Sequence, residues 1–146
     1  MKVAKVVAIN ISEEKGQPKQ AIDKGYFAVN CGLRGDAHAG EWHRQVSLLG
    51  NESIDKIKKL GFDNLATGSF AENITTEGLI LYELPVGTKL KVGETIMEVT
   101  QIGKECHMGC AIREKTGDCV MPREGIFAKV ITPGWIKPGD VLERLN

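Results

Sequence analysis

Residues 85–102 read PVGTKLKVGETIMEVTQI, and this stretch decides the fold. Two short segments that contain β-branched residues, 88–92 and 95–102, are separated only by Gly93 and Glu94. Runs of this length joined through a glycine predict two strands, because glycine adopts the positive φ that a tight turn requires. The stretch therefore indicates a protein built from short strands and tight turns.

The same pattern continues along the rest of the chain. Further strands are expected at 3–11, 126–131 and 140–145, where short β-branched runs are bordered by glycine, proline or polar residues. One helix is expected over 51–60, capped by Asn51 or Gly50, because its isoleucines recur at helical spacing. These elements predict a mainly β fold, a barrel or sandwich, and the lack of a linker predicts a single domain over 1–146.

Composition excludes several classes of protein. The 146 residues are 42% hydrophobic and 26% charged, and 19 basic side chains balance 19 acidic ones, so a general polyanion-binding surface is not implied. The N-terminal apolar stretch is interrupted by lysines and is too short for a signal or a membrane span. We therefore expect a cytoplasmic protein, in which the four cysteines are catalytic, metal-binding or inert rather than disulfide-bonded.

The first polar constellation is the glycine-rich stretch 32–40, followed by 43–49. Arg34, Asp36 and His38 stand between glycines that let a ligand approach the backbone, and Arg44 follows shortly. The spacing matches neither a dinucleotide fingerprint nor a P-loop. A binding loop is favoured slightly over an ordinary turn in which Asp36 caps the backbone and Arg34 pairs with a carboxylate.

The second constellation is the segment 68–78, where Glu72 and Asn73 lie between apolar neighbours. In a strand these two side chains would point to opposite faces, so at most one would face the core directly. A buried Glu72 would need partners, and Arg34 or Arg44 is a candidate. The structural interpretation of Glu72 is favoured over a functional one.

The third constellation, residues 101–110, is the strongest indication of function in the sequence. Cys106 stands between Lys104 and His107, whose positive charge would lower the thiol pKa and raise the thiolate fraction. The alternatives are an inert packing cysteine, a zinc site formed with His107, Cys110 and Cys119, or a persulfide passed between Cys106 and Cys110.

The fourth constellation is 117–130, in which Pro122 and Gly125 bracket a turn that presents Arg123 before a strand. An arginine at this place suits a phosphate or carboxylate, or an ion pair with Glu72 or Asp36. For Cys31, Trp42 and Trp135 we expect packing roles.

Taken in order, these segments resemble the MOSC family, named for the C-terminal domain of molybdenum-cofactor sulfurases. The resemblance is carried by 32–40, 44–49, 70–74, 86–90, 101–110, 125–128 and 139–140, and so spans nearly the whole chain. It implies a MOSC-type β-barrel with a few short helices, in a stand-alone form without the pyridoxal-phosphate desulfurase domain.

The resemblance also implies a function. Members of the family bind or deliver sulfur, bind molybdenum cofactor, or reduce N-hydroxylated compounds with molybdenum held by a cysteine that matches Cys106. On this basis Cys106 is expected as the reactive thiolate and metal ligand, tuned by Lys104 and His107. The expected cofactor-binding residues are Arg34, Asp36, His38, Arg44, Asn73 and Arg123.

Two departures from the family bear on the choice among these activities. Glu105 stands where many members have proline, and Cys-His-x-x-Cys replaces a single thiol. Carriage of a persulfide sulfur or binding of molybdopterin is therefore favoured over N-hydroxyl reduction, with a zinc-stabilised binding or docking module as the competing hypothesis. The expected partners are a cysteine desulfurase, cofactor-biosynthesis proteins or molybdoenzymes, and neither nucleic acid nor a membrane.

Overall fold

A computed structural model describes residues 3–14, 19–59, 68, 70–103 and 124–145. The elements are β1 (Val3–Ile11), β2 (Gln20–Ile22), β3 (Gly25–Ala28), β4 (Gly32–Leu33), β5 (Val46–Gly50), α1 (Asn51–Lys58), β6 (Ile74–Glu77), the 3-10 turn η1 (Leu81–Glu83), β7 (Lys89–Val92), β8 (Thr95–Ile102), β9 (Ile126–Thr132), β10 (Gly134–Ile136) and β11 (Val141–Arg144).

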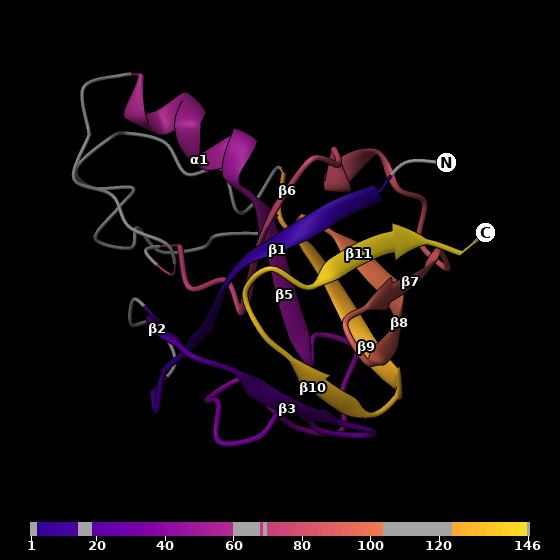
Figure 1. Ribbon diagram of the computed structural model, residues 1–146. Coiled ribbons are helices and arrows are strands. Elements are labelled where there is room, and N and C mark those ends of the chain that lie inside the picture. Colours follow the sequence, from indigo (N-terminus) through magenta and orange to yellow (C-terminus); the bar gives the residue numbers. More distant parts are fainter. Residues whose placement is uncertain (1–2, 15–18, 60–67, 69, 104–123, 146) are drawn as a thin grey trace.

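The main sheet closes into a barrel of seven strands. Its order is β11-β7-β8-β9-β5-β6-β1, with β2 added beside β1, and a pairing of β11 with β1 completes the circle. A separate small sheet, β10-β3-β4, lies across one end of the barrel, and α1 lies at the other end (Figure 1). The mainly β prediction is thus confirmed as a barrel.

The expected elements form with small differences in their ends. Residues 3–11 and 95–102 are strands over their whole expected length, and the strands expected at 88–92, 126–131 and 140–145 are β7, β9 and β11. The helix begins after Gly50, which is its N-cap, and ends at Lys58, while the expected end at Leu60 lies outside the described residues.

Strand β1 carries an irregularity that matters for the site. Its pairing with β6 shifts register between Val6 and Ala8, which is the signature of a β-bulge. Ala4 and Val6 face the core before the bulge, and Ile9 faces it after the bulge. The extra residue therefore turns Asn10, a buried side chain, away from the apolar core.

The core fills the barrel with inward-facing side chains of its seven strands. Leu48 of β5 is opposite Ile74 of β6 and Ile126 of β9, and all three are fully buried. Cores of this kind are packed at crystal-like density, so a lost side chain leaves a cavity.

Replacing Leu48 with alanine is expected to lower the free energy of unfolding by about 2–5 kcal/mol, because the cavity is closed in on all sides. The matched control is Leu145→Ala, which removes the same atoms from a side chain that is 46% exposed and should change stability by about 0.5 kcal/mol or less. Urea denaturation of both variants measures the difference. Equal losses would contradict the core assignment.

Glu72 and Asn73 are both fully buried, and they do not alternate as the strand residues that the sequence suggested. The reason is that Glu72 precedes β6, in a turn where Ala71 has a φ of 64°, so strand alternation does not apply to it. The Glu72 carboxylate accepts hydrogen bonds from the Gly68 N–H at 2.9 Å, the Phe70 N–H at 3.3 Å and the Thr75 hydroxyl at 2.7 Å. The expected arginine partner is not found among the described residues, and Glu72 instead secures the turn that leads to Asn73.

Burial raises the pKa of the Glu72 carboxyl above its ordinary value of 4.5, although its three hydrogen bonds act in the opposite direction. A raised pKa means that the folded state holds this proton more tightly than the unfolded chain. Its contribution to stability is then complete below pH 4.5 and is lost as the pH rises through the raised value.

Replacing Glu72 with glutamine, which stays neutral, should therefore flatten the decline of stability as the pH rises above 4.5. Thermal unfolding of the wild-type protein and the variant across this range gives the two slopes. A parallel decline in both proteins would show that Glu72 is not the group responsible.

Candidate functional site

The candidate site lies on the outer surface of the barrel, where β1, β5, β6 and β9 run side by side. Leu48 and Ile74 point into the core, so the neighbouring Ser47 and Asn73 point outward. Ser47 and Asn73 are nevertheless buried, which means that the chain packs over them. Buried polar side chains on an outer barrel face require partners, and these partners define the site.

Asn73 joins three strands through its amide. Its Oδ1 accepts the Ser47 N–H at 3.0 Å and the Ser47 hydroxyl at 3.2 Å, and its Nδ2 donates to the Asn10 carbonyl at 3.3 Å. Asn10 in turn donates to the Glu72 carbonyl and the Thr75 hydroxyl, each at 3.1 Å. The amide of Asn73 thereby fixes the relative positions of β1, β5 and β6.

Asp36 forms a buried ion pair with Lys19. The Lys19 ammonium lies 2.7 Å from Asp36 Oδ1, and neither side chain has any exposed surface. The Ser12 N–H donates to the same Asp36 oxygen at 3.1 Å, and the other oxygen accepts the His38 N–H at 3.1 Å. Asp36 thus caps the local turn at His38 and ties this turn to Lys19 and Ser12.

Burial alone would raise the pKa of the Asp36 carboxyl, but the hydrogen bonds of Lys19, Asn73 and Ser12, together with the charge of Lys19, outweigh burial and hold it below its ordinary value. Asp36 consequently stays ionised, and its contribution to stability is present above pH 3.8 and lost as the pH falls through the lowered value. The pair provides a fixed negative charge and a fixed positive charge beside the partly exposed ring of His38.

Arg44 is connected to this loop through Trp42. The Trp42 indole N–H donates to the His38 carbonyl at 2.7 Å, and the Arg44 guanidinium lies 4.9 Å from the Trp42 ring and 5.7 Å from the Phe127 ring. Phe127 is paired with Ser47 across β5 and β9, so Arg44 lies over the same outer face as Asn73.

The Arg44 Nε atom is buried and has no hydrogen-bond partner among the described residues. Arg44 makes no ion pair within the described ranges. Its guanidinium is held by its contacts with the two aromatic rings. An unsatisfied buried donor of a charged group is costly, so this nitrogen is available to an acceptor that approaches the site.

The other predicted site residues divide into two sets. Arg34 is exposed, and its guanidinium stacks on the ring of Tyr26 in β3 at 4.5 Å. Lys104, Cys106, His107 and Arg123 lie outside the described residues, as do Cys110 and Cys119 of the zinc alternative. Among residues that are described, no group of three or more histidine, cysteine or acidic side chains could hold a metal ion.

Lys19, Ser47 and Asn10 belong to the site but were not predicted. Lys19 precedes Asp36 by seventeen positions and stands in a polar stretch, so nothing in the local pattern marks it as buried. Asn10 belongs to a strand that alternation does predict, and only the bulge in β1 turns its side chain toward the site. Trp42, expected to pack, forms the rim between His38 and Arg44.

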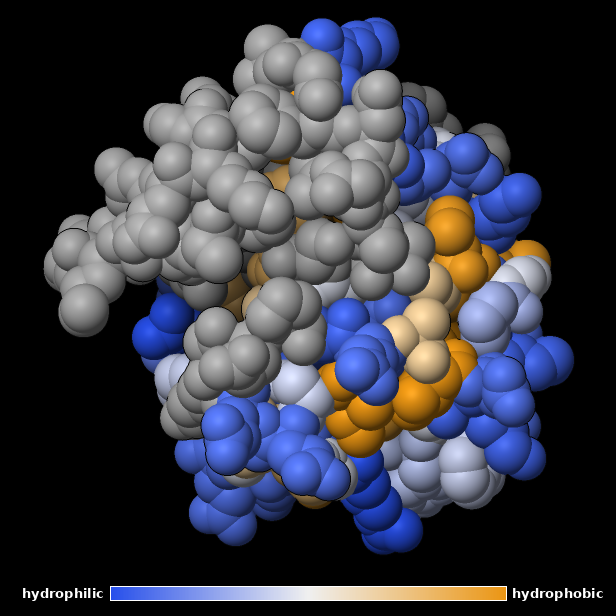
Figure 2. Space-filling view, turned by 90° about the vertical axis from the view of Figure 1, so that its left-hand side faces the viewer, coloured by the Kyte–Doolittle hydropathy of each residue, from blue (hydrophilic) through white to orange (hydrophobic). Residues whose placement is uncertain are grey.

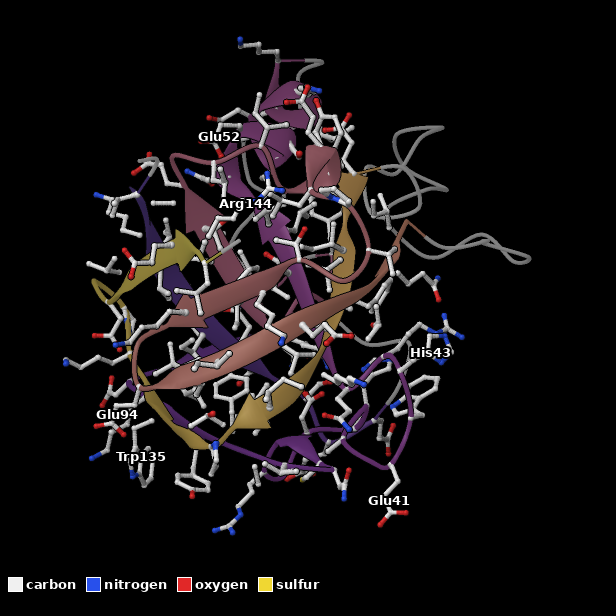
Figure 3. All side chains as sticks on the ribbon, turned by 90° about the vertical axis from the view of Figure 1, so that its right-hand side faces the viewer. Glu41, His43, Glu52, Glu94, Trp135 and Arg144 are labelled. Carbon is white, nitrogen blue, oxygen red and sulfur yellow. The ribbon has the colours of Figure 1, made fainter. Side chains whose placement is uncertain are left out.

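Surface hollows among the described residues lie elsewhere. A pocket of about 420 Å³ beside Trp135 includes Glu94, and Figure 3 shows both of these far from His43, which lies on the loop before β5. A groove of about 540 Å³ runs beside β2, on the side where Figure 2 shows an apolar area bordered by hydrophilic residues. Neither hollow is lined by a predicted site residue, and the chemistry of the polar cluster identifies the site better than volume does.

None of the helices that the structure describes is long and apolar enough to cross a membrane. The comparison with curated proteins gave no significant match.

Solved structures share the fold. YuaD from Bacillus subtilis has a TM-score of 0.79 and 20% identity, with 96% of this chain and 94% of YuaD covered. YiiM from Geobacillus stearothermophilus has a TM-score of 0.74 and 20% identity, with 98% and 75% covered. YiiM from Escherichia coli has a TM-score of 0.68 and 18% identity, with 100% and 70% covered.

The model of the MOSC domain family matches residues 35–143, which include most of the barrel and the segments from Asp36 to Asn73. The match covers well over half of the chain, and the barrel agrees with it. The chain therefore belongs to the MOSC domain family.

Proposed function

We propose that this protein binds an anionic molybdenum–pterin cofactor on the outer face of the barrel, with Cys106 as its thiolate ligand. The observation that supports this most directly is Arg44, a cation held between two aromatic rings with a buried Nε that lacks an acceptor among the described residues. A phosphate accepts two parallel hydrogen bonds from a guanidinium and also balances its charge, so an anionic ligand would satisfy Arg44 in both respects.

The donor set on this face fits such a ligand. Arg44 and His38 lie on either side of Trp42, and the Lys19–Asp36 pair contributes no net charge, so the excess charge of the described cluster is positive. Asn73 uses its amide on Ser47 and Asn10 and serves to hold the strands together. Arg44 and His38 would hold the anionic part, and Cys106 would supply a soft ligand of the kind molybdenum and sulfur favour.

When bound, the cofactor would supply a molybdenum centre with exchangeable sulfur or oxygen ligands. The chain's own residues would bind and orient it.

Sulfur carriage is the second candidate, and the grouping of Cys106 with Lys104, His107 and Cys110 favours it. A thiolate stabilised by neighbouring positive charge can accept a sulfane sulfur from a cysteine desulfurase and pass it to a second thiol. The receiving partner would be a cofactor-biosynthesis protein or a molybdoenzyme. Both candidates depend on the same cysteine and differ in what it carries.

Intact mass spectrometry of native protein distinguishes them. After incubation with molybdenum cofactor, or separately with a cysteine desulfurase and cysteine, the wild-type protein should gain a cofactor or a sulfur adduct. Cys106→Ser should lose the adduct, whereas the control Cys31→Ser, at a partly buried thiol in the turn between β3 and β4, should retain it. A protein that gains neither adduct but holds stoichiometric zinc would overturn both candidates and favour the zinc-stabilised module.

Arg44→Ala should weaken cofactor binding by about tenfold to a hundredfold, the worth of a hydrogen bond to a charged group. The charge-matched control is Arg144→Ala on the exposed end of β11, well separated from the His43 loop in Figure 3. Fluorescence titration with the cofactor, or isothermal calorimetry, measures both affinities. Equal losses in the two variants would mean that general charge, not the position of Arg44, attracts the ligand.

A further inference from the structure

The Lys19 ammonium has three hydrogen-bond contacts, which is the number of protons it carries. Its Nζ lies 2.7 Å from Asp36 Oδ1, 3.0 Å from the Ser12 hydroxyl oxygen and 3.2 Å from His38 Nδ1. The Ser12 hydroxyl donates onward to the Glu14 carbonyl at 3.1 Å, so its oxygen is open to accept from Lys19. Each of the three protons of Lys19 therefore has an acceptor of its own.

This arrangement determines the state of the His38 ring. A lysine ammonium only donates, so Nδ1 of His38 must offer its lone pair. A neutral imidazole carries one proton, and that proton must then be on Nε2. Rotating the ring by 180° would put a carbon against the ammonium, and protonating Nδ1 would put two donors 3.2 Å apart.

The main chain of His38 is tied to the same ion pair. Its N–H donates to Asp36 Oδ2 at 3.1 Å, while the ring nitrogen Nδ1 lies 3.8 Å from that oxygen, beyond hydrogen-bond distance. Asp36 thus fixes the backbone of His38, and Lys19 fixes its ring.

We propose that Lys19 is a positioning residue that holds His38 as the Nε2–H tautomer, so that Nε2 has the character of a donor, and not of an acceptor, toward an anionic oxygen or sulfur of a bound ligand. The ligand part of this inference rests on the proposed function, whereas the tautomer does not. In this state His38 is neither a general base nor a metal ligand through Nδ1, because Lys19 occupies that lone pair.

A purely structural role for the pair is the competing interpretation. A buried ion pair is weak support for stability, because desolvating two charges offsets much of their attraction. A lysine that only neutralised Asp36 would not need the contact with His38. The two interpretations differ in the ring proton of His38, which can be observed directly.

The test is long-range nitrogen–proton correlation NMR on uniformly nitrogen-15-labelled full-length protein near pH 8, where an ordinary imidazole is neutral. His38→Gln assigns the His38 signals. His43 is the internal control, because its Nε2 lies 2.9 Å from Gln101 Oε1, a carbonyl oxygen that only accepts, and none of the described lysines contacts its ring. We expect wild-type His38 to show a protonated Nε2 and an unprotonated Nδ1, and an Nδ1–H ring would overturn the proposal without any variant.

Lys19→Met removes the donor and leaves Asp36 as the nearest acceptor for the ring. The His38 proton should then move largely to Nδ1, while the His43 signals stay unchanged. Lys19→Arg keeps a donor at this position and should retain the wild-type tautomer. A folded Lys19→Met protein that keeps the Nε2–H ring would show that Lys19 does not set the tautomer. If this variant does not fold, the spectra of the wild-type and Lys19→Arg proteins still test whether His38 is the Nε2–H tautomer.

Cofactor and sulfur binding give the second readout. With the molybdenum cofactor as probe, Lys19→Met should bind about tenfold more weakly than wild type, and Lys19→Arg should recover most of the loss. Unchanged affinity in a Lys19→Met protein whose tautomer has moved would overturn the donor role of His38. A wild-type protein that binds neither probe would overturn the proposed function, while the tautomer result would stand by itself.

Discussion

Strand β1 is the element on which the rest of the structure depends, because it pairs with three other strands. Val3–Lys5 pair with β11 and close the barrel, Lys5–Ile9 pair with β6, and Ile9–Ile11 pair with β2. Closure leaves no open edge in the barrel wall. The bulge in the middle of β1 lets Val6 and Ile9 both face the core, and it turns Asn10 toward Asn73 and Glu72. One extra residue in one strand therefore converts part of the outer wall into a polar site.

Two buried carboxyl groups beside this strand show how the surroundings of a side chain determine its pKa. Asp36 and Glu72 are almost wholly removed from water, and burial acts on both to raise the pKa. Asp36 has the Lys19 ammonium at 2.7 Å, so its pKa is lowered and it stays ionised. Glu72 has only neutral donors, so its pKa is raised. Asp36 accordingly holds a permanent charge next to His38, and Glu72 fixes the turn that carries Asn73.

The sequence predicted the strands whose two faces differ and the helix with an apolar stripe. It did not predict β5, whose five residues are all buried, because such a strand shows no alternation. Strands β2, β4 and β10 have two or three residues each, too few for any periodicity to appear. For the site, the loop of Asp36 and His38 was predicted from its glycines, but Lys19 was not, since the contact joins residues seventeen positions apart and depends on how β1 and the loop pack. Arg34 and Arg44 looked equivalent in sequence, and only the fold separates them.

The difference between Arg44 and the other cations follows from their surroundings. The chain carries equal numbers of basic and acidic side chains, so any local excess of charge comes from the fold and not from composition. Lys5, Lys56, Lys129 and Lys137 each lie within 4 Å of a carboxylate at the surface. Lys24 and Arg34 lie over aromatic rings of the small sheet, and both residues are exposed to solvent. The Arg44 guanidinium lies over an aromatic ring, and its buried Nε donor has no acceptor among the described residues. Arg44 is on the same face as His38 and Asn73. A surface charge with no further role would keep this nitrogen in water, so its burial on this face is the observation on which the proposed anionic ligand rests.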